Sequence, residues 1–161
     1  MKNATKLLPL LLALLLTAPE ANAQNRPDEG TVGLTASIQG GQTNLRAPIW
    51  FSEELSVAPI LGINHRADSF TDLNFGVSPR FYQDMGNNFA SYIGAQGLVQ
   101  YTSPEIGPED TDILLGATGG GEYFLGGHFS LGVEGQLNFL INDNGNDAFS
   151  TAAAVMGTYY F

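Results

Sequence analysis

The sequence contains no cysteine and few basic residues. Without cysteine the chain has no disulfide, no thiol chemistry and no cysteine-ligated zinc site. Its six lysines and arginines stand against sixteen aspartates and glutamates, for a formal net charge of −10. That balance excludes a protein that binds nucleic acid, which needs a basic surface for the phosphates. No segment shows the helical spacing of apolar residues either.

Glycine and aromatic residues are plentiful instead. The 161 residues include 20 glycines, and 11% of the chain is aromatic while only 14% is charged. This composition is unusual for a soluble helical domain and is typical of short β-strands joined by turns. The length suits one domain rather than two.

The first 23 residues have the features of an export signal. Lys2 and Lys6 precede an apolar run over residues 7–16, and Ala21, Asn22 and Ala23 form a small-x-small cleavage pattern. The run falls short of the ~20 apolar residues that a membrane-spanning helix requires. We expect a cleavable signal helix over 1–23, followed by a polar leader over 24–30.

From residue 31 onward, apolar and polar residues alternate with a period of two, as in β-strands. The clearest example places Phe129, Leu131 and Val133 on one face, with Ser130 and Glu134 on the other. Most of the segments reach the ~9–11 residues with which a tilted strand crosses a bilayer. There are eight such segments, over residues 31–39, 44–51, 55–64, 72–82, 89–101, 111–124, 128–141 and 148–161.

Alternation alone fits two opposite designs. A soluble lipocalin-like barrel in the periplasm points its apolar face inward to bind a small apolar ligand, whereas a membrane barrel turns that face to lipid. In this sequence Arg46, Arg80, Glu122 and Glu134 all fall on the polar face, and the apolar face carries no charged residue in any of the eight segments. This favours the membrane barrel, with the soluble barrel as the alternative.

Aromatic residues support the same choice. Seven of them lie beside the connections after the second, fourth and sixth segments or at the chain end. They would therefore gather at one rim of the barrel, as lipid-interface aromatics do. They are Phe51, Phe81, Phe89, Tyr123, Phe129, Tyr159 and Phe161.

The end of the chain carries a family resemblance. Val155, Gly157, Tyr159 and Phe161 alternate up to a C-terminal phenylalanine, which resembles the assembly signal of Gram-negative outer-membrane barrels. With the export signal and the eight segments, the chain resembles the small eight-stranded outer-membrane β-barrels of the OmpA/OmpX-like, porin-family type. The resemblance implies an all-β fold, an eight-stranded antiparallel up-and-down transmembrane barrel over 31–161, after a periplasmic leader.

The same resemblance implies where the chain works and what it meets. Both termini would be periplasmic, with turns at 52–54, 83–88 and 125–127 and outer loops at 40–43, 65–71, 102–110 and 142–147. The expected partners are outer-membrane lipid, lipopolysaccharide, the barrel-assembly machinery and periplasmic chaperones, with no nucleic acid. We expect a monomeric, non-enzymatic protein without cofactor or metal, whose role is structural or one of surface interaction through its acidic loops.

The interior charges and the prolines of the strands each predict a specific structural feature. Eight strands enclose a lumen that their own side chains fill, so the interior charges Arg46, Arg80, Glu122 and Glu134 are expected to pair in one cluster. Proline donates no ladder hydrogen bond, and a closed barrel has no edge strand. Pro48, Pro59 and Pro79 therefore predict an irregularity around the second and third strands.

A catalytic site is a remote alternative. His128 and Ser130 have the spacing seen in outer-membrane lipid-modifying hydrolases, with Glu134 nearby. The asparagine that follows the serine in that family is replaced by Leu131, and the pair would lie at a periplasmic turn. Two histidines without neighbouring ligands make no metal site.

Overall fold

The computed structural model describes residues 26–39, 42–66, 70–104, 110–142, 145 and 147–161. The predicted signal at 1–23, the first leader residues and much of the outer loops lie outside them. The described part contains no helix long and apolar enough to cross a membrane. Its strands are β1 (Gly33–Gln39), β2 (Gln42–Arg46), β3 (Ile49–Trp50), β4 (Leu55–Arg66), β5 (Phe70–Asp84), β6 (Phe89–Pro104), β7 (Asp110–Phe124), β8 (Phe129–Ile141) and β9 (Ala148–Tyr160).

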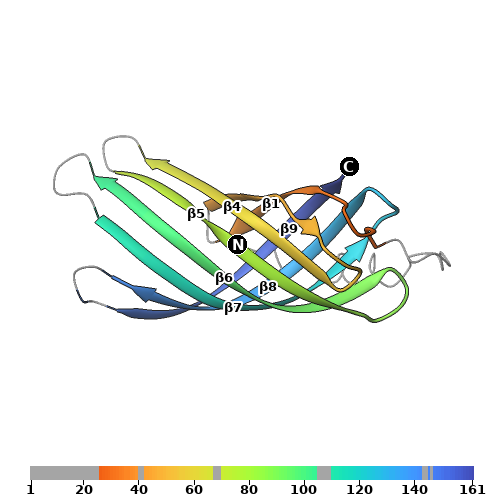
Figure 1. Cartoon of the computed structure of the whole chain (residues 1–161). Coiled ribbons are helices and arrows are strands. Elements are labelled where there is room, and N and C mark those ends of the chain that lie inside the picture. The colour runs from red at the N-terminus through yellow and green to blue at the C-terminus, as the bar shows by residue number, and fades with distance from the viewer. Residues whose placement is uncertain (1–25, 40–41, 67–69, 105–109, 143–144, 146) are drawn as a thin grey trace, which may run out of the picture.

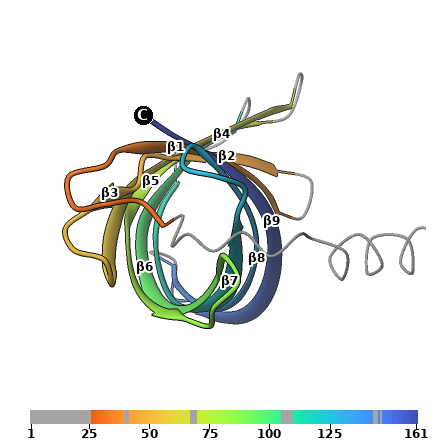
Figure 2. The same ribbon diagram turned by 90° about the vertical axis from the view of Figure 1, so that its right-hand side faces the viewer.

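The strands form one closed antiparallel barrel (Figures 1 and 2). β4 to β9 pair in sequence order, and β9 pairs with β1 to close the sheet. Stepping from Ala148 through successive paired residues around the barrel leads back to β9 at Thr158, a stagger of ten residues. Such a stagger tilts the strands against the barrel axis. The predicted eight-stranded up-and-down barrel is confirmed, with β2 and β3 together taking the place of one of its eight strands.

Proline explains why that strand is divided into β2 and β3. Pro48 separates β2 from β3, yet both pair with β4 in a single register. The N–H of Ala47 still donates to the carbonyl of Pro59 over 3.0 Å, while Pro48 has no N–H to offer. The β5–β6 pairing likewise skips Pro79 without a change of register. The predicted irregularity is therefore an interruption of the ladder, not a slip of the strands.

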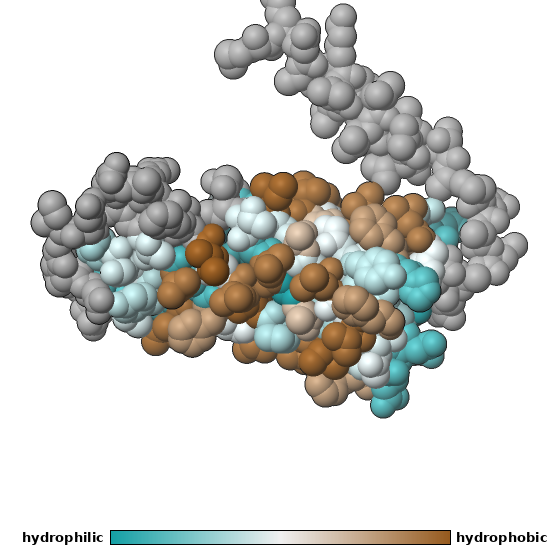
Figure 3. All heavy atoms as spheres, turned by 90° about the horizontal axis from the view of Figure 1, so that it is seen from above, coloured by the Kyte–Doolittle hydropathy of each residue, from teal (hydrophilic) through white to brown (hydrophobic). Residues whose placement is uncertain are grey.

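Burial alternates along the strands with the predicted period. Along β8, Phe129, Leu131 and Val133 are exposed, whereas Ser130 and Glu134 are buried. Apolar side chains cover much of the outside (Figure 3). The alternative of a soluble barrel with an apolar interior is wrong for the described strands, because the polar face points inward.

The two ends of the barrel differ in their connections. At the turn end, on the right of Figure 1, residues 51–54, 85–88 and 125–128 join the strands. The second turn is shorter than predicted because β5 continues through Asp84. Asn87 and Asn88 adopt positive φ angles of 52° and 62° there, after Gly86 at 79°. These left-handed residues let the tight turn reverse the chain. We call the opposite end the loop end.

Candidate functional site in the barrel lumen

Three layers of side chains point into the lumen. From the turn end to the loop end they are an aromatic layer, an ionic layer and an amide layer. The aromatic layer consists of Trp50, Tyr82, Tyr92, Phe124 and Tyr160, with Ala90 and Met156 packed among them. The ionic layer consists of Arg46, Arg80 and Glu134, and the amide layer of Gln39, Asn44, Asn74, Gln96, Gln100, Gln136 and Asn138.

The aromatic layer lies at the turn end. Trp50 and Tyr82 have ring centroids 4.6 Å apart, and the rings of Phe124 and Tyr160 lie 6.2 Å apart. Trp50 and Phe124 are each only 1% exposed. The sequence interpretation missed this layer, although the alternation already placed Trp50 and Tyr82 on the same face as Arg46 and Arg80. Their position on the inward face was the sequence feature that could have predicted an aromatic layer inside the barrel.

Glu134 is the centre of the ionic layer. Arg46 donates to both of its carboxylate oxygens, over 3.1 and 2.9 Å, and Arg80 donates to Oε2 over 2.6 Å. The Tyr92 hydroxyl and the Gln136 amide each donate to it over 2.8 Å. Five donors around one buried carboxylate meet the condition under which a buried ion pair is tolerated, namely that its remaining lone pairs are satisfied.

The two arginines share one carboxylate, so this layer has a surplus positive charge. The guanidinium carbon of Arg80 lies 4.6 Å from the centre of the Tyr92 ring, a cation–π contact that supports the charge. The Nε–H groups of Arg46 and Arg80 are buried without a hydrogen-bond partner among the described residues.

Glu122 lies apart from that ion pair. Its carboxylate accepts hydrogen bonds from the hydroxyls of Tyr82, over 2.9 Å, and Tyr160, over 2.8 Å, and a further one from Ser130. Among the described residues it forms no salt bridge. The structure therefore brings Arg46, Arg80 and Glu134 together but not the fourth member of the expected cluster.

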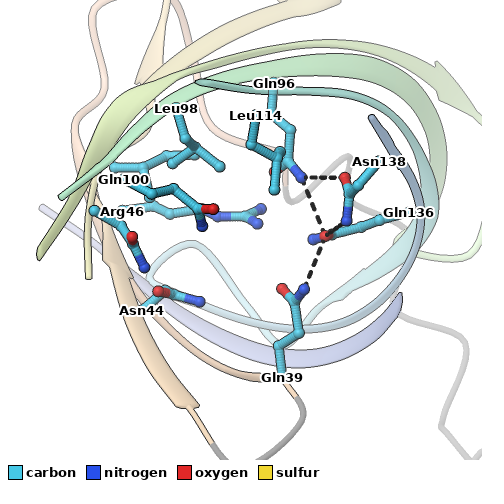
Figure 4. A pocket seen from close by; sticks show the side chains of 11 residues that line it. Gln39, Asn44, Arg46, Gln96, Leu98, Gln100, Leu114, Gln136 and Asn138 are labelled. Atoms are coloured by element: carbon cyan, nitrogen blue, oxygen red, sulfur yellow. Dashed lines mark hydrogen bonds between the residues drawn. The ribbon is translucent and has the colours of Figure 1, made fainter. Parts of the chain in front are cut away.

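The amide layer encloses a cavity at the loop end (Figure 4). Gln136 Oε1 accepts from Gln39 over 3.0 Å and from Gln96 over 3.1 Å, and Gln96 also donates to Asn138 over 2.9 Å. The cavity has a volume of about 50 Å³. It is lined by these amides together with Asn44, Asn74 and Gln100, by the apolar Ile60, Leu98 and Leu114, and by Arg46.

The structure does not assemble the remote hydrolase site. Ser130 is fully buried, and its hydroxyl donates to Glu122. The His128 ring hydrogen-bonds the carbonyl of Tyr160 over 3.1 Å rather than Ser130. No cluster of three or more potential metal ligands occurs within the part of the chain that the structure describes.

The seven aromatics expected at a lipid interface lie on the outer face near the turn end. Phe89 pairs with Tyr123, and Phe129 pairs with Tyr159. Most of the seven are well exposed, from 38% at Phe89 to 73% at Phe161. Val155 and Tyr159 of the expected assembly signal share this outward face of β9.

The fold is that of small outer-membrane β-barrels. The N-terminal β-barrel domain of Pseudomonas aeruginosa OprF superimposes with a TM-score of 0.63 over 83% of this chain and 98% of that domain, at 10% identity. Neisserial surface protein A superimposes with a TM-score of 0.60 over 81% of this chain and 94% of that protein, at 17% identity. No protein-family model matches the sequence, and no curated protein matches it either. The predicted resemblance is confirmed for the fold.

Proposed function

We propose that the chain is a non-enzymatic, integral outer-membrane β-barrel protein with a structural or surface-interaction role. The observation that carries this is the orientation of the faces: apolar side chains such as Ile93 and Val155 are 73% and 63% exposed, while Arg46, Arg80 and Glu134 are buried inside. Only a lipid surrounding makes such an exterior favourable.

The layers of the lumen support a role other than a general pore. The aromatic and ionic layers fill the turn half with buried side chains, as expected for a barrel of eight strands. A lumen plugged in this way leaves the exterior and the loops for function. The proposed partners are outer-membrane lipid, lipopolysaccharide, the assembly machinery and periplasmic chaperones, with the barrel as a monomer.

Gel mobility of the detergent-extracted protein, with and without boiling, tests this proposal. A closed membrane barrel resists SDS in the cold, so the unboiled and boiled samples should migrate differently. The matched control is a variant with Val133→Arg, which places a charge on the outward face of β8. That change should weaken the barrel by about 2–4 kcal/mol if the residue lies at mid-membrane. A wild-type protein that stays soluble without detergent and shows no mobility difference contradicts the proposal.

A further inference from the structure

The barrel wall is lower on one side of the loop end. The β1–β2 hairpin ends at Gln39 and Gln42, whereas β9 continues to Ala148 on one flank and β4 to Arg66 on the other (Figure 1). The last described pair between β9 and β1 is Ala154 with Gln39. We call the gap above the hairpin, between residues 148–153 of β9 and 63–66 of β4, the notch.

Backbone groups of β9 without a described partner line the notch. Toward the turn end the N–H of Phe161 donates to Val32, on the β1 side, while the N–H of Tyr160 donates to His128, on the β8 side. By the same alternation Thr151 directs its N–H and C=O away from β8 and into the notch. No described residue pairs with Thr151 on that side.

This unpaired edge lies within the apolar band of the barrel. Phe149, 69% exposed, stands ten residues along β9 from Tyr159 of the turn-end aromatics. At the usual rise and tilt of such strands that is about 25 Å along the barrel axis, the height of the lipid-facing band. Thr151 therefore lies below the upper edge of the band, where an unpaired backbone group needs a polar partner.

The cavity of the amide layer lies directly behind the loop end of β1, since Gln39 forms part of its lining (Figure 4). Asn74 is only 7% exposed, points into this cavity and has no hydrogen-bond partner for its side chain among the described residues. The half-exposed Asn44 and Gln100 also line it, and no described residue hydrogen-bonds their side-chain amides. An amide that borders a cavity without a described partner can hydrogen-bond water or a ligand there, and each amide has both donors and an acceptor.

The charges of the site favour a neutral ligand. Arg46 is the one charged residue of the cavity lining, and it already donates twice to Glu134. The surplus positive charge of the ionic layer is balanced toward the mouth by Asp72 and Asp112, which follow on the inward-facing positions of β5 and β7. Hydroxyl groups both donate and accept, so they match the unpaired amides without adding charge. The aromatic and ionic layers close the cavity below, so a ligand would bind here rather than pass through.

We propose that the amide-lined cavity binds the neutral, hydroxyl-rich head group of a sugar-bearing amphiphile that enters sideways through the notch. A cavity of about 50 Å³ admits one or two hydroxyl groups, which replace ordered water, while the rest of the head group lies in the notch. The apolar chain then follows the outward face beside Ile38 and Phe149, which are 65% and 69% exposed. This inference rests on the proposed membrane-barrel function.

The test uses the chain extracted from membranes in dodecyl dimethylamine oxide, a detergent without hydroxyl groups. Dodecyl maltoside is titrated in, and the side-chain amide resonance of Gln100 is followed by NMR. We expect a saturable shift at one amphiphile per barrel, weakened at least tenfold by Asn74→Leu. Gln83→Leu, on the same strand but exposed near the turn end, should leave it unchanged. An equal shift in the Asn74→Leu variant overturns the site.

Two further arms examine the ligand and the route. Maltose without a chain should bind at least tenfold more weakly, and dodecyl phosphocholine, which has a charged head without hydroxyls, should not compete. Lengthening the β1–β2 hairpin by two residues in each strand should close the notch and abolish the shift. Binding that survives this change, or tight binding of free maltose, overturns lateral entry. Loss of the cold SDS-resistant band in the wild type would instead refute the membrane barrel itself. That result comes from the gel, so it is distinguishable from a failure of the ligand site.

Discussion

The two halves of the lumen accommodate their inward-facing side chains in different ways. In the turn half, aromatic rings pack against one another and every oxygen of Glu134 and Glu122 has a donor. In the loop half, Asn44, Asn74 and Gln100 border a cavity, and their side-chain amides have no hydrogen-bond partner among the described residues. The first half is built for stability. Both halves contain donors without a described partner, since the Nε–H groups of Arg46 and Arg80 and the indole N–H of Trp50 are buried and unbonded. The amides of the loop half differ in that they border a cavity, which is where a barrel of this size can bind a ligand.

The largest effect should come from the ionic layer. Glu134→Gln keeps the shape of the side chain but leaves Arg46 and Arg80 without a counterion. Breaking a buried ion pair in this way costs about 3–5 kcal/mol. Urea unfolding of the barrel in thin phosphatidylcholine vesicles measures it, with the fluorescence of Trp50, the single tryptophan, as the probe. A change in unfolding free energy below about 1 kcal/mol would contradict the role of Glu134.

Next in size is a comparison of packing between the halves. Phe124→Ala removes a ring that is 1% exposed from the aromatic layer and should cost about 3 kcal/mol. Leu114→Ala, which faces the loop-end cavity, should cost about 1 kcal/mol, because water can enter the space left behind. The same urea unfolding measurement compares the two losses of stability. Equal losses at the two sites would mean that the loop half is packed as tightly as the turn half.

A smaller loss is expected at Glu122. Its partners are hydroxyls, and a hydroxyl can donate or accept. Glu122→Gln therefore keeps most of the network and should cost about 1–2 kcal/mol, the difference between hydrogen bonds to a charged and to a neutral group. The two isosteric changes, at residues 122 and 134, form a matched pair. A larger loss at Glu122 than at Glu134 would reverse our assignment of the ionic layer.

The smallest effect on stability is predicted for the amide layer. Asn74→Leu removes an amide that no described residue hydrogen-bonds, so the unfolding free energy should stay within about 1 kcal/mol of the wild type. Gln136→Leu is the control, because Gln136 is hydrogen-bonded to Glu134, Gln39 and Gln96. If both variants lose stability equally, Asn74 has a partner that the described residues do not include.

Much of the barrel could be predicted from local pattern. The alternation of Phe129, Leu131 and Val133 with Ser130 and Glu134 identified the strand, and the placement of every charge on one face identified the inside. Strand ends were predicted to within a few residues at most positions. Pro48 was correctly expected to disturb its strand, because a missing N–H has the same consequence in any closed sheet.

The contacts inside the lumen were not predictable in the same way. The sequence places Arg46, Arg80, Glu122 and Glu134 on the inward face, but it does not say which of them lie at one height. Glu134 meets both arginines, while Glu122 falls one level lower among tyrosine hydroxyls. The aromatic layer was overlooked although Trp50 and Tyr82 were already placed inward, because aromatic residues were considered only as interface anchors.

Local pattern was enough to predict the strands, their two faces and the direction in which each side chain points, because those depend on a backbone period of two within a single strand. Which interior groups are in contact is a property of the closed barrel. That depends on closure of the sheet with a stagger of ten residues, which brings Arg46 to Glu134 across 88 positions of the chain. The stagger is set by the pairing of all the strands together, so no single segment contains it.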